Sequence, residues 1–387
     1  MTSKLSDLCA FADGRVAVAD LDLDRYISTE NMLPNKEGIT RSAGLPTVNQ
    51  TQAYQAEDVL VSNIRPYFRK IWYADRDGGC SNDVLVFRAK ENVYPNFLYY
   101  LLSDDTFFDY ATATAKGTKM PRGDKGAIMR YEVPDLPLDI QIGIADTLSA
   151  LDARITENRA INNHLEQMAQ AIFKSWFVDF EPFGGIMPDD WREGTISDLG
   201  DVVGGSTPSK AKPEYYTQHG IAWITPKDLS VNKNKFIAHG ADDITELGLR
   251  NSSARLMPRG TILFSSRAPI GYIAVASGKV CTNQGFKSIV PKERVGTAFI
   301  YYFLIENLQT IENMASGSTF KEVSGTTMKG IPAVIPDDVT LRQFQDECTP
   351  IFEKQELLEA ENAHLAEMRD TLLPRLMSGE LSVADAK

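Results

Sequence analysis

The sequence contains little cysteine and no long apolar run. Its four cysteines form no Cys-x-x-Cys pair and no Cys/His ligand spacing, which argues against a zinc site; they are Cys9, Cys80, Cys281 and Cys348. They are expected to be buried free thiols of a reducing compartment. No apolar run approaches the roughly 18 residues that cross a bilayer, and the N-terminus lacks the apolar segment of a signal peptide. These absences predict a cytoplasmic protein.

Motifs of enzymatic chemistry are also missing. The stretch VVGGSTPS has two glycines but lacks the Gly-x-x-x-x-Gly-Lys-Ser/Thr pattern of a phosphate-binding loop. The chain has no Pro-Pro dipeptide, so it lacks the Asn/Asp-Pro-Pro-aromatic motif of an amino-methyltransferase. His164 and His364 occupy equivalent places in two predicted helices, and surface or packing roles are expected for them rather than a catalytic pair. The sequence therefore predicts a non-catalytic protein with no metal and no cofactor of its own.

Basic residues are not in excess overall, because the formal net charge is −12. The charge is segregated, however. Residues 204–294 hold 13 Lys/Arg against 6 Asp/Glu, and residues 116–130 hold 5 against 1. Residues 337–387 hold 5 against 12. Since nucleic-acid binding needs a local basic face rather than a basic average, the net charge does not exclude it.

The chain repeats itself at an offset of about 200 residues, which is too long a period for a solenoid. The phrase NNHLEQM, at residues 162–168, returns as NAHLAEM at residues 362–368. Six further pairs of motifs occur in the same order in both halves of the chain: LSDL and ISDL, VLVSNIRP and ILFSSRAP, CSND and CTNQ, FLYYLL and FIYYFL, AKGTKM and ASGSTF, and VP and IP. The ordered set indicates two copies of one unit.

Each copy is predicted to begin with a strand-rich part, because short β-branched runs alternate with Gly, Pro, Asn and Asp. A short aromatic helix and a long helix follow. Apolar and amide residues recur in the long helices at spacings of four and three, which is typical of a coiled coil. The first seam is Ile144, Leu148, Leu151, Ile155, Asn158, Asn162, Leu165, Ala169, Ile172 and Trp176. The second is Phe344, Cys348, Ile351, Gln355, Leu358, Asn362, Leu365, Arg369, Leu372 and Leu376.

Polar residues in these seams are expected to matter for pairing. Gln355 and Arg369 should weaken the second seam, whereas the asparagines cost stability and can fix the register. Two similar units in one chain can pack about a pseudo-two-fold axis. An axis across the long helices would make them antiparallel. Two unrelated amphipathic helices are the alternative.

The predicted fold class is α/β (α+β). It comprises two strand-rich domains related by pseudo-two-fold symmetry and separated by two long helices in an antiparallel coiled coil. The expected boundaries are 1–138 for the first strand-rich domain, 139–182 for the first arm, 183–338 for the second domain and 339–387 for the second arm. Two similar heads on a rod suit a ligand with two sites at a fixed separation.

Three basic or polar loops are the candidates for nucleic-acid contact, because Lys and Arg neutralise phosphates while polar side chains read base edges. They cover residues 116–130, 205–229 and 315–325, and the first and third occupy matched positions of the repeat. A solvated loop is the alternative for each. The candidates are Arg65, Asn82, Asp83, Lys116, Thr118, Lys119, Arg122, Lys125, Lys210, Lys227, Arg267, Asn283, Gln284, Ser318, Thr319 and Lys321.

The chain resembles the specificity subunits of type I restriction–modification enzymes over nearly its whole length. The resemblance is carried by three stretches: LSALDARITENRAINNHLEQMAQAIFKSWFVDFEPF at residues 148–183, GGSTPSKAKPEYYTQHGIAWITPKDLS at residues 204–230, and LLPRLMSGEL at residues 372–381. The first resembles the central helix of that family and the second the opening of a target-recognition domain. The third resembles the C-terminal signature of the family.

The resemblance implies that each strand-rich domain recognises one half of a split DNA sequence through the major groove, and that the coiled coil sets the gap. Two modification subunits would supply S-adenosylmethionine and adenine methylation. Motor–nuclease subunits would supply cleavage with ATP and Mg²⁺. The residues expected in the coil and in partner docking are Leu148, Leu151, Ile155, Asn158, Asn162, Leu165, Ile172, Trp176, Phe177, Ile351, Leu358, Asn362, Leu365, Leu372 and Leu376.

Two function classes stay open from the residues alone. One is a sequence-specific DNA-recognition subunit. The other is a non-catalytic coiled-coil scaffold whose two heads bind proteins and never contact DNA. The repeat and the coil permit both, whereas the basic loops and the resemblance favour the first. Salt-sensitive binding to duplex DNA would distinguish them.

Overall fold

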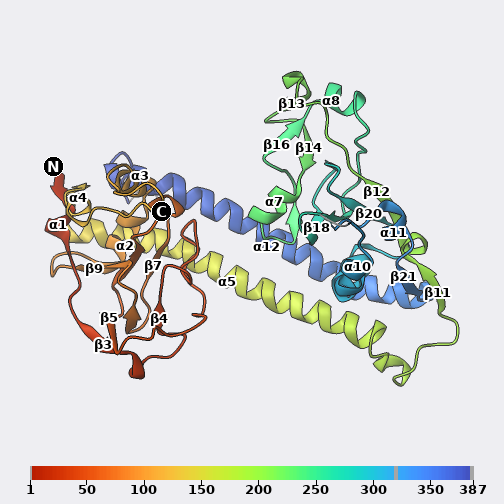
Figure 1. The fold of residues 1–387 in the computed structure, drawn as a ribbon, viewed down its shortest axis with the longest axis horizontal. Coiled ribbons are helices and arrows are strands. Elements are labelled where there is room, and N and C mark those ends of the chain that lie inside the picture. The colour runs from red at the N-terminus through yellow and green to blue at the C-terminus, as the bar shows by residue number, and fades with distance from the viewer. Residues whose placement is uncertain (1, 318–320, 384–387) are drawn as a thin grey trace. The chain divides into compact units, whose positions relative to one another are not determined.

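The structure is a computed structural model that describes residues 2–317 and 321–383. It contains both helices and strands (Figure 1) and divides into two compact units. Unit 1 comprises Met1–Ile155 and His364–Lys387, and unit 2 comprises Thr156–Ala363. Each unit thus holds one strand-rich domain and a part of both long helices.

The two long helices are α5 (Leu138–Phe177) and α12 (Asp338–Ser378), of 40 and 41 residues. In unit 2 they run antiparallel. Asn158 on α5 contacts Asn362 on α12, and further along α5 Glu166 contacts the earlier residue Gln355. In unit 1, Asp152 on α5 contacts Arg369 on α12. Long paired helices with strand-rich domains confirm the predicted fold class.

The strand-rich domain of unit 1 contains two four-stranded sheets, ordered β2-β9-β6-β7 and β3-β5-β8-β4, and a ribbon of β1 with β10. The aromatic helix α2 covers the first sheet, since Phe97 and Leu101 share a core with Val59 and Phe87. The elements are β1 (Thr2–Lys4), α1 (Leu5–Leu8), β2 (Cys9–Phe11), β3 (Arg15–Ala17), η1 (Val18–Asp20), β4 (Tyr26–Ile27), β5 (Gln50–Tyr54), β6 (Val59–Ser62), η2 (Pro66–Phe68), β7 (Ile71–Tyr73), β8 (Gly78–Cys80), β9 (Val84–Ala89), α2 (Pro95–Ser103), α3 (Asp105–Ala113), α4 (Lys125–Ile128) and β10 (Glu132–Pro134).

The strand-rich domain of unit 2 has a five-stranded sheet, β12-β20-β17-β18-β15, a four-stranded sheet, β13-β16-β14-β19, and a ribbon of β11 with β21. Its elements are η3 (Glu181–Phe183), β11 (Arg192–Thr195), α6 (Ile196–Leu199), β12 (Gly200–Gly204), η4 (Pro213–Tyr215), β13 (Tyr216–Thr217), β14 (Ile221–Ile224), α7 (Pro226–Val231), β15 (Phe236–Ile237), β16 (Asp242–Ile244), α8 (Glu246–Arg250), β17 (Ile262–Ser266), β18 (Ile270–Ala276), β19 (Val280–Thr282), β20 (Lys287–Pro291), α9 (Thr297–Glu306), α10 (Leu308–Asn313), α11 (Gly325–Lys329) and β21 (Pro332–Ile335).

The repeat read from the sequence is present in the two folds. LSDL and ISDL form the equivalent helices α1 and α6, and FLYYLL and FIYYFL lie in the equivalent helices α2 and α9. The prolines of the VP and IP motifs lie in strands β10 and β21. Each of these strands pairs antiparallel with the first strand of its domain, β1 or β11. The second sheets differ in strand order, β3-β5-β8-β4 in unit 1 and β13-β16-β14-β19 in unit 2, although each contains a parallel pair, β4 with β8 and β14 with β19.

The four cysteines are free and buried, as expected. Burial raises the pKa of all four thiols to about 12, because a thiolate would lose its hydration there. Among the described residues, no helix is both long and apolar enough to cross a membrane.

Candidate nucleic-acid interface

The basic loop of unit 1 is closed by its own backbone. Lys116 N donates to the Arg122 carbonyl at 2.8 Å, and Arg122 N donates to the Lys116 carbonyl at 2.9 Å. Thr118, Lys119 and Met120 lie exposed between these two residues. Lys116 forms an ion pair with Asp124, which caps helix α4 by accepting from Ala127 N. The loop is therefore a short closed hairpin that presents its basic side chains to solvent.

This hairpin lies on the end of the central strand β6. Gly123 N donates to the Asn63 carbonyl at 3.1 Å, and Arg65 N donates to the Pro121 carbonyl at 2.8 Å. Asn63 N donates in turn to the carbonyl of Asp83 at 2.8 Å, in the turn that also contains Asn82. We call this grouping site 1; it consists of Asn63, Arg65, Asn82, Asp83, Lys116 and Arg122.

An ion pair also joins the hairpin of site 1 to this turn. Arg122 Nη2 lies 3.1 Å from Asp83 Oδ1, and both side chains are partly exposed. The structure thus brings together residues that the sequence separates by 57 positions, from Arg65 to Arg122. Lys125 lies beyond the hairpin at the start of α4, with its Nζ 5.6 Å from the centre of the Phe11 ring.

Unit 2 contains an equivalent arrangement. Ser316 N donates to the Glu322 carbonyl at 3.1 Å, and Glu322 N donates to the Ser316 carbonyl at 2.9 Å. Val323 N donates to the carbonyl of Ser266, at the end of β17, at 3.0 Å. Ser266 N donates to the Gly285 carbonyl at 2.8 Å. We call this grouping site 2; it consists of Ser266, Arg267, Asn283, Gln284, Lys287 and Glu322.

The carboxylate of Glu322 lies between two basic side chains of site 2. Its Oε2 is 3.3 Å from Arg267 Nη1, and its Oε1 is 3.2 Å from Lys287 Nζ. Lys321 is exposed beside it. The candidates Ser318 and Thr319 lie outside the described residues.

A residue with a left-handed backbone directly before a proline occurs in site 1 and directly after Arg267 of site 2. Arg65 has φ 49° and precedes Pro66, and Ala268 has φ 50° and precedes Pro269. Few residues other than glycine adopt a positive φ, and such positions concentrate at functional sites. The two residues are aligned by the VLVSNIRP and ILFSSRAP repeat, so the left-handed position recurs, although the Ala268–Pro269 peptide bond is cis and the Arg65–Pro66 bond is trans.

Buried polar atoms without partners gather near the two sites. Within the described residues, Asn63 Oδ1 and Arg65 Nε in site 1 make no hydrogen bond, nor do Thr282 Oγ1 and Ser288 Oγ, which adjoin Asn283 and Lys287 of site 2. Such atoms are uncommon in folded proteins, because each costs free energy unless water or a ligand satisfies it. Among the described residues, each site therefore has two buried polar atoms without a partner in it or next to it.

The glycine-rich stretch of residues 202–209 also approaches site 2. Ser206 N donates to the Thr282 carbonyl at 2.8 Å. A Cβ on Gly205 would lie 2.0 Å from the Asn283 carbonyl oxygen, so only glycine allows this approach. Thr207 Oγ1 donates to Gln284 Oε1. The glycines therefore serve close backbone packing beside the site.

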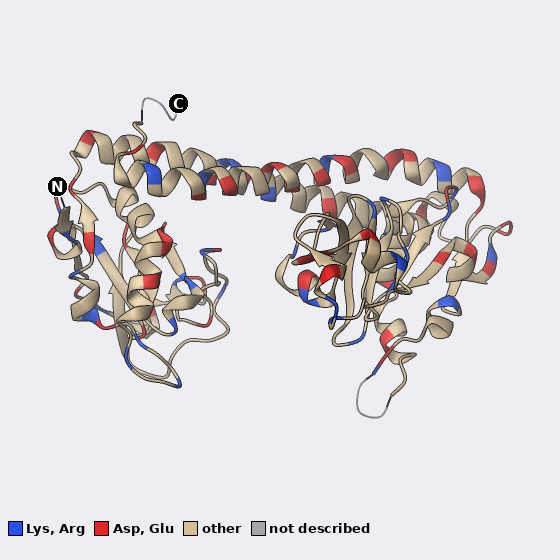
Figure 2. Cartoon of the chain, turned by 90° about the horizontal axis from the view of Figure 1, so that it is seen from above, with Lys and Arg blue, Asp and Glu red and all other residues tan. Residues whose placement is uncertain are grey.

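Two further candidates lie in the strand-rich domain of unit 2. Lys227 lies exposed on α7, whose Pro226 would be 3.0 Å from a Cβ on Gly285. Lys210 is exposed in a turn of the polar loop that covers residues 205–229. Lys and Arg residues are otherwise spread over both strand-rich domains and both long helices (Figure 2).

Sequence reasoning missed several residues of these sites. Tyr67 and Phe68 are exposed on η2 directly after Arg65, and their rings lie 4.8 Å apart. Lys287 and Glu322 complete site 2. Glu322 could have been found, because it stands 200 positions after Arg122 in the repeat. Tyr67 and Phe68 could not, because aromatic residues of a strand end usually belong to a core.

Within unit 2, a buried lysine connects the strand-rich domain to both long helices, α5 and α12. Lys235, directly before β15, forms an ion pair with Glu166 of α5, and its Nζ lies 2.9 Å from Gln355 Oε1 of α12. Its Nζ also lies 4.0 Å from the centre of the Phe352 ring. Burial lowers the pKa of Lys235, whereas Glu166 opposes that effect. Gln355, expected to weaken the seam, instead carries this attachment.

The attachment in unit 1 uses other residues. Tyr100 of α2 donates to Asp152 of α5 at 2.7 Å, and Arg369 of α12 donates to the other oxygen of Asp152 at 2.6 Å. Arg369 was also expected to weaken the seam. Here too the exception to the apolar pattern is a polar contact that ties the domain to the helices.

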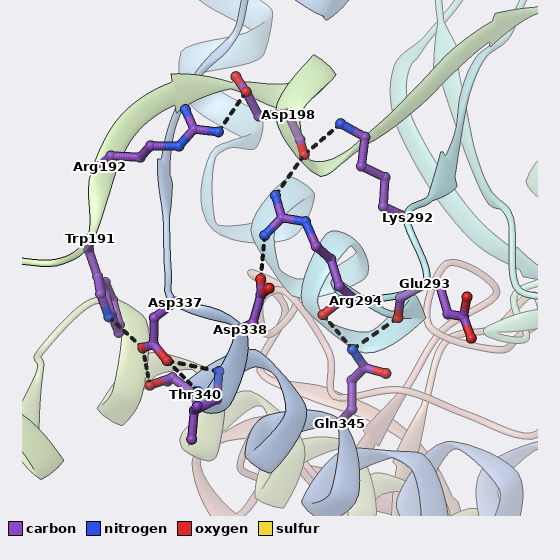
Figure 3. Close-up of polar contacts among 11 residues, drawn as sticks. Trp191, Arg192, Asp198, Lys292, Glu293, Arg294, Asp337, Asp338, Thr340 and Gln345 are labelled. Atoms are coloured by element: carbon purple, nitrogen blue, oxygen red, sulfur yellow. Dashed lines mark hydrogen bonds and ion pairs between the residues drawn. The ribbon is translucent and has the colours of Figure 1, made fainter.

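A cluster of polar contacts holds the start of α12 to the strand-rich domain of unit 2 (Figure 3). Asp337 accepts from Thr340 N at 3.0 Å and from Trp191 Nε1 at 3.1 Å. Burial opposes ionisation of Asp337, but these hydrogen bonds outweigh it and lower its pKa. Arg294 lies 2.7 Å from Asp338, and Gln345 Nε2 donates to the Arg294 carbonyl at 2.8 Å.

The residues expected in the coil line the helix faces. Leu148, Ile155, Asn158, Leu358 and Leu376 are buried. The others are partly buried: Leu151, Asn162, Leu165, Ile172, Trp176, Phe177, Ile351, Asn362, Leu365 and Leu372. Trp176 and Phe177 pack on Phe344, and Phe177 also packs on Phe299 with ring centres 4.9 Å apart. The aromatic end of α5 is therefore part of the core of unit 2.

Residues 2–317 and 321–383 contain no group of three or more His, Cys, Asp or Glu side chains that could hold a metal ion. His164 and His364 are exposed on their helices. The chemistry available at sites 1 and 2 is that of hydrogen bonding and charge.

Comparison with known proteins defines the class. The family model described as type I restriction modification DNA specificity domain matches residues 1–167 and 188–357. The match covers most of the chain and both repeats, so the chain belongs to this family. The resemblance read from the sequence is confirmed.

Individual relatives carry matching names. The HindI specificity subunit of Haemophilus influenzae is 28% identical over 437 aligned positions, covering 92% of this chain and 94% of that protein. The MjaIX specificity subunit of Methanocaldococcus jannaschii is 41% identical over 164 residues, which cover 42% of this chain and only 38% of that protein. The S subunit of a type I restriction–modification system from M. genitalium has a similar fold, with a TM-score of 0.61, 17% identity, and coverage of 97% of this chain and 96% of that one.

Proposed function

We propose that this chain is the DNA-specificity subunit of a type I restriction–modification complex. In this proposal, each strand-rich domain reads one half of a bipartite DNA target, and the two long helices set the spacer. The observation that carries the proposal is the duplicated loop-on-strand arrangement of sites 1 and 2, in a chain of the specificity-domain family. Two equivalent sites in one chain suit a target with two halves.

The residues proposed to contact DNA are those of the two sites and their flanks. Exposed lysines would neutralise phosphates, and Arg, Asn and Gln side chains would read base edges. Most of them lie on the two closed loops or next to strand ends, where several side chains would approach one groove. They are Arg65, Asn82, Lys116, Thr118, Lys119, Arg122 and Lys125 in the first half, and Lys210, Lys227, Arg267, Asn283, Gln284 and Lys321 in the second.

The chemistry is assigned to partners. Two modification subunits would bring S-adenosylmethionine, and motor–nuclease subunits would bring ATP and Mg²⁺, while this chain brings no cofactor. We propose 1–138 and 183–338 as the recognition domains, and 139–182 and 339–387 as the arms on which partners dock. Methyl transfer to DNA by the purified chain, free of partner subunits, would refute the non-catalytic assignment.

The proposal is tested by selection from a random duplex library with the chain assembled on its modification subunits. A split consensus with a constant gap is expected, and binding should weaken steeply with salt. Binding that ignores both sequence and salt would refute the proposal. The heads would then be protein-binding modules on a scaffold.

A further inference from the structure

Each site contains an ion pair between an arginine and a carboxylate, one of which lies on the closed loop. The loop supplies the arginine in site 1 but the carboxylate in site 2. In site 1 the loop supplies Arg122, and the turn before β9 supplies Asp83. In site 2 the loop supplies Glu322, and the residue after β17 supplies Arg267. Positions 122 and 322 are structurally equivalent, because each forms the same two backbone hydrogen bonds, to residues 116 and 316 respectively.

These pairs do little for the stability of the fold. The exposed fractions are 54% for Arg122 and 38% for Asp83, and 38% for Arg267 and 35% for Glu322. Ion pairs at such exposure contribute between zero and about 1 kcal/mol. An arginine–carboxylate pair at both sites, with the charge of the loop residue inverted, therefore needs another explanation.

Orientation of the arginine is that explanation. A guanidinium has five N–H donors in one plane, so a carboxylate that accepts from one edge leaves donors free on the others. A carboxylate also restricts the side chain before a ligand arrives, which lowers the entropy lost on binding. In site 2 the carboxylate is itself held, because Lys287 Nζ lies 3.2 Å from Glu322 Oε1 and 3.4 Å from Ser266 Oγ.

We propose that Arg122 and Arg267 each read a guanine and that Asp83 and Glu322 are the positioning residues that hold the two guanidinium planes. Guanine presents two acceptors in the major groove, O6 and N7, which match two donors of an arginine. The inference rests on the proposed function. Because the arginine comes from the loop in site 1 and from the strand end in site 2, the two guanines occupy different places relative to their domains.

The test is a double-mutant cycle on site 2, with the chain assembled on its modification subunits. Binding to all single-base variants of the selected target is measured for wild type, Arg267→Ala, Glu322→Ala and the double variant. Arg267→Ala is expected to lose the preference for one guanine, by roughly 5- to 150-fold. Glu322→Ala should weaken the preference at the same base pair, and the double variant should discriminate no worse than Arg267→Ala.

Two further variants separate orientation from charge. Arg267→Lys keeps the charge but cannot form the two-donor contact, so it should keep non-specific affinity and lose the guanine preference. Glu293 follows β20 at the end opposite Lys287 and lies beside Gln345 of α12 (Figure 3), so Glu293→Gln should leave every base preference unchanged. The same cycle with Asp83→Ala and Arg122→Ala tests site 1.

The outcomes are distinguishable from failure of the proposed function. A wild-type complex without any base preference refutes the proposed function itself. If wild type is selective, the inference is overturned when Arg267→Ala changes no preference. It is also overturned when Glu322→Ala changes no base preference. A change of preference at a different base pair overturns it too, because Glu322 would then be a direct reader of cytosine.

Discussion

Asn158 Nδ2 of α5 donates to Asn362 Oδ1 of α12 at 3.0 Å, and Asn158 is fully buried. Two amides thus face one another in a seam that also contains many apolar residues. Within the described residues, Asn158 Oδ1 and Asn162 Oδ1 have no hydrogen-bond partner, so the arrangement costs stability. A buried asparagine pair of this kind specifies which residues face each other along a coiled coil.

The asparagine pair predicts non-additive effects. Asn158→Leu should destabilise unit 2 by about 1–3 kcal/mol, because the amide of Asn362 then faces an apolar side chain. Asn158→Leu combined with Asn362→Leu should recover that loss, because neither amide is left without its partner. Unfolding in denaturant measures both. Additive losses in the double variant would show that the two amides are independent.

Lys235 predicts a large effect from a neutral replacement of similar shape. Lys235→Met removes the cation that Glu166 and Gln355 share within unit 2. Removing one partner of a buried pair lowers the free energy of unfolding by about 3 kcal/mol, or somewhat less where the other partner reaches water. A loss of about 3 kcal/mol corresponds to a melting temperature lower by roughly 6–12 °C. Lys233→Met, at an exposed neighbouring position, is the matched control and should change little. Equal melting temperatures for the two variants would contradict the role of Lys235.

Asp337 predicts a pH-dependent contribution to stability. Its pKa is lowered in the folded chain, so the stabilisation is present above the pKa of the unfolded chain, near 3.8, and is lost as the pH falls through the lower folded pKa. Asn at this position still caps α12 but carries no charge. Asp337→Asn should therefore cost about 0.5–1 kcal/mol at pH 7 and progressively less below pH 3.8. A cost that stays constant down to strongly acidic pH would contradict this assignment.

The basic loops predict a change in salt dependence. Replacing Lys116, Lys119 and Lys125 by Ala should lower affinity about equally for all DNA sequences. It should also reduce the slope of log K against log salt by about one for each phosphate that the variant no longer neutralises. The same applies to Lys210, Lys227 and Lys321 in the second half. An unchanged slope in either triple variant would reject the phosphate contacts proposed for that half.

The sequence predicts the repeat, the long helices and most of the residues that gather at sites 1 and 2, because these follow from order, period and residue type. It does not predict Lys235, which counted only as one of the basic residues of 204–294. Its burial depends on Glu166 and Gln355, more than 60 positions away on either side. Charge counting assumes that every lysine is on the surface.

The polar seam residues show a second limit. Gln355 and Arg369 break the apolar pattern, and periodicity alone treats them as defects. In the structure they contact Lys235 and Asp152, so they connect a strand-rich domain to the helices. A one-dimensional pattern describes what two helices need from each other. It carries no information on a third element that packs across both.

In the proposed function, the two long helices hold two DNA-reading domains at one separation. One heptad inserted after Asn158 and another after Leu358 should keep the phase of both seams and lengthen the paired helices by about 10 Å. That equals close to three base pairs at about 3.4 Å each, and it rotates the second half-site by roughly 100° around the duplex. Because DNA twisting must absorb part of that rotation, affinity should fall.

The decisive measurement is selection of targets from a library with variable spacer, using the lengthened chain on its modification subunits. Both half-site sequences should stay the same while the preferred spacer changes. Circular dichroism of the lengthened chain confirms beforehand that its helices are intact. Selection of the original spacer by an intact lengthened chain would contradict the account.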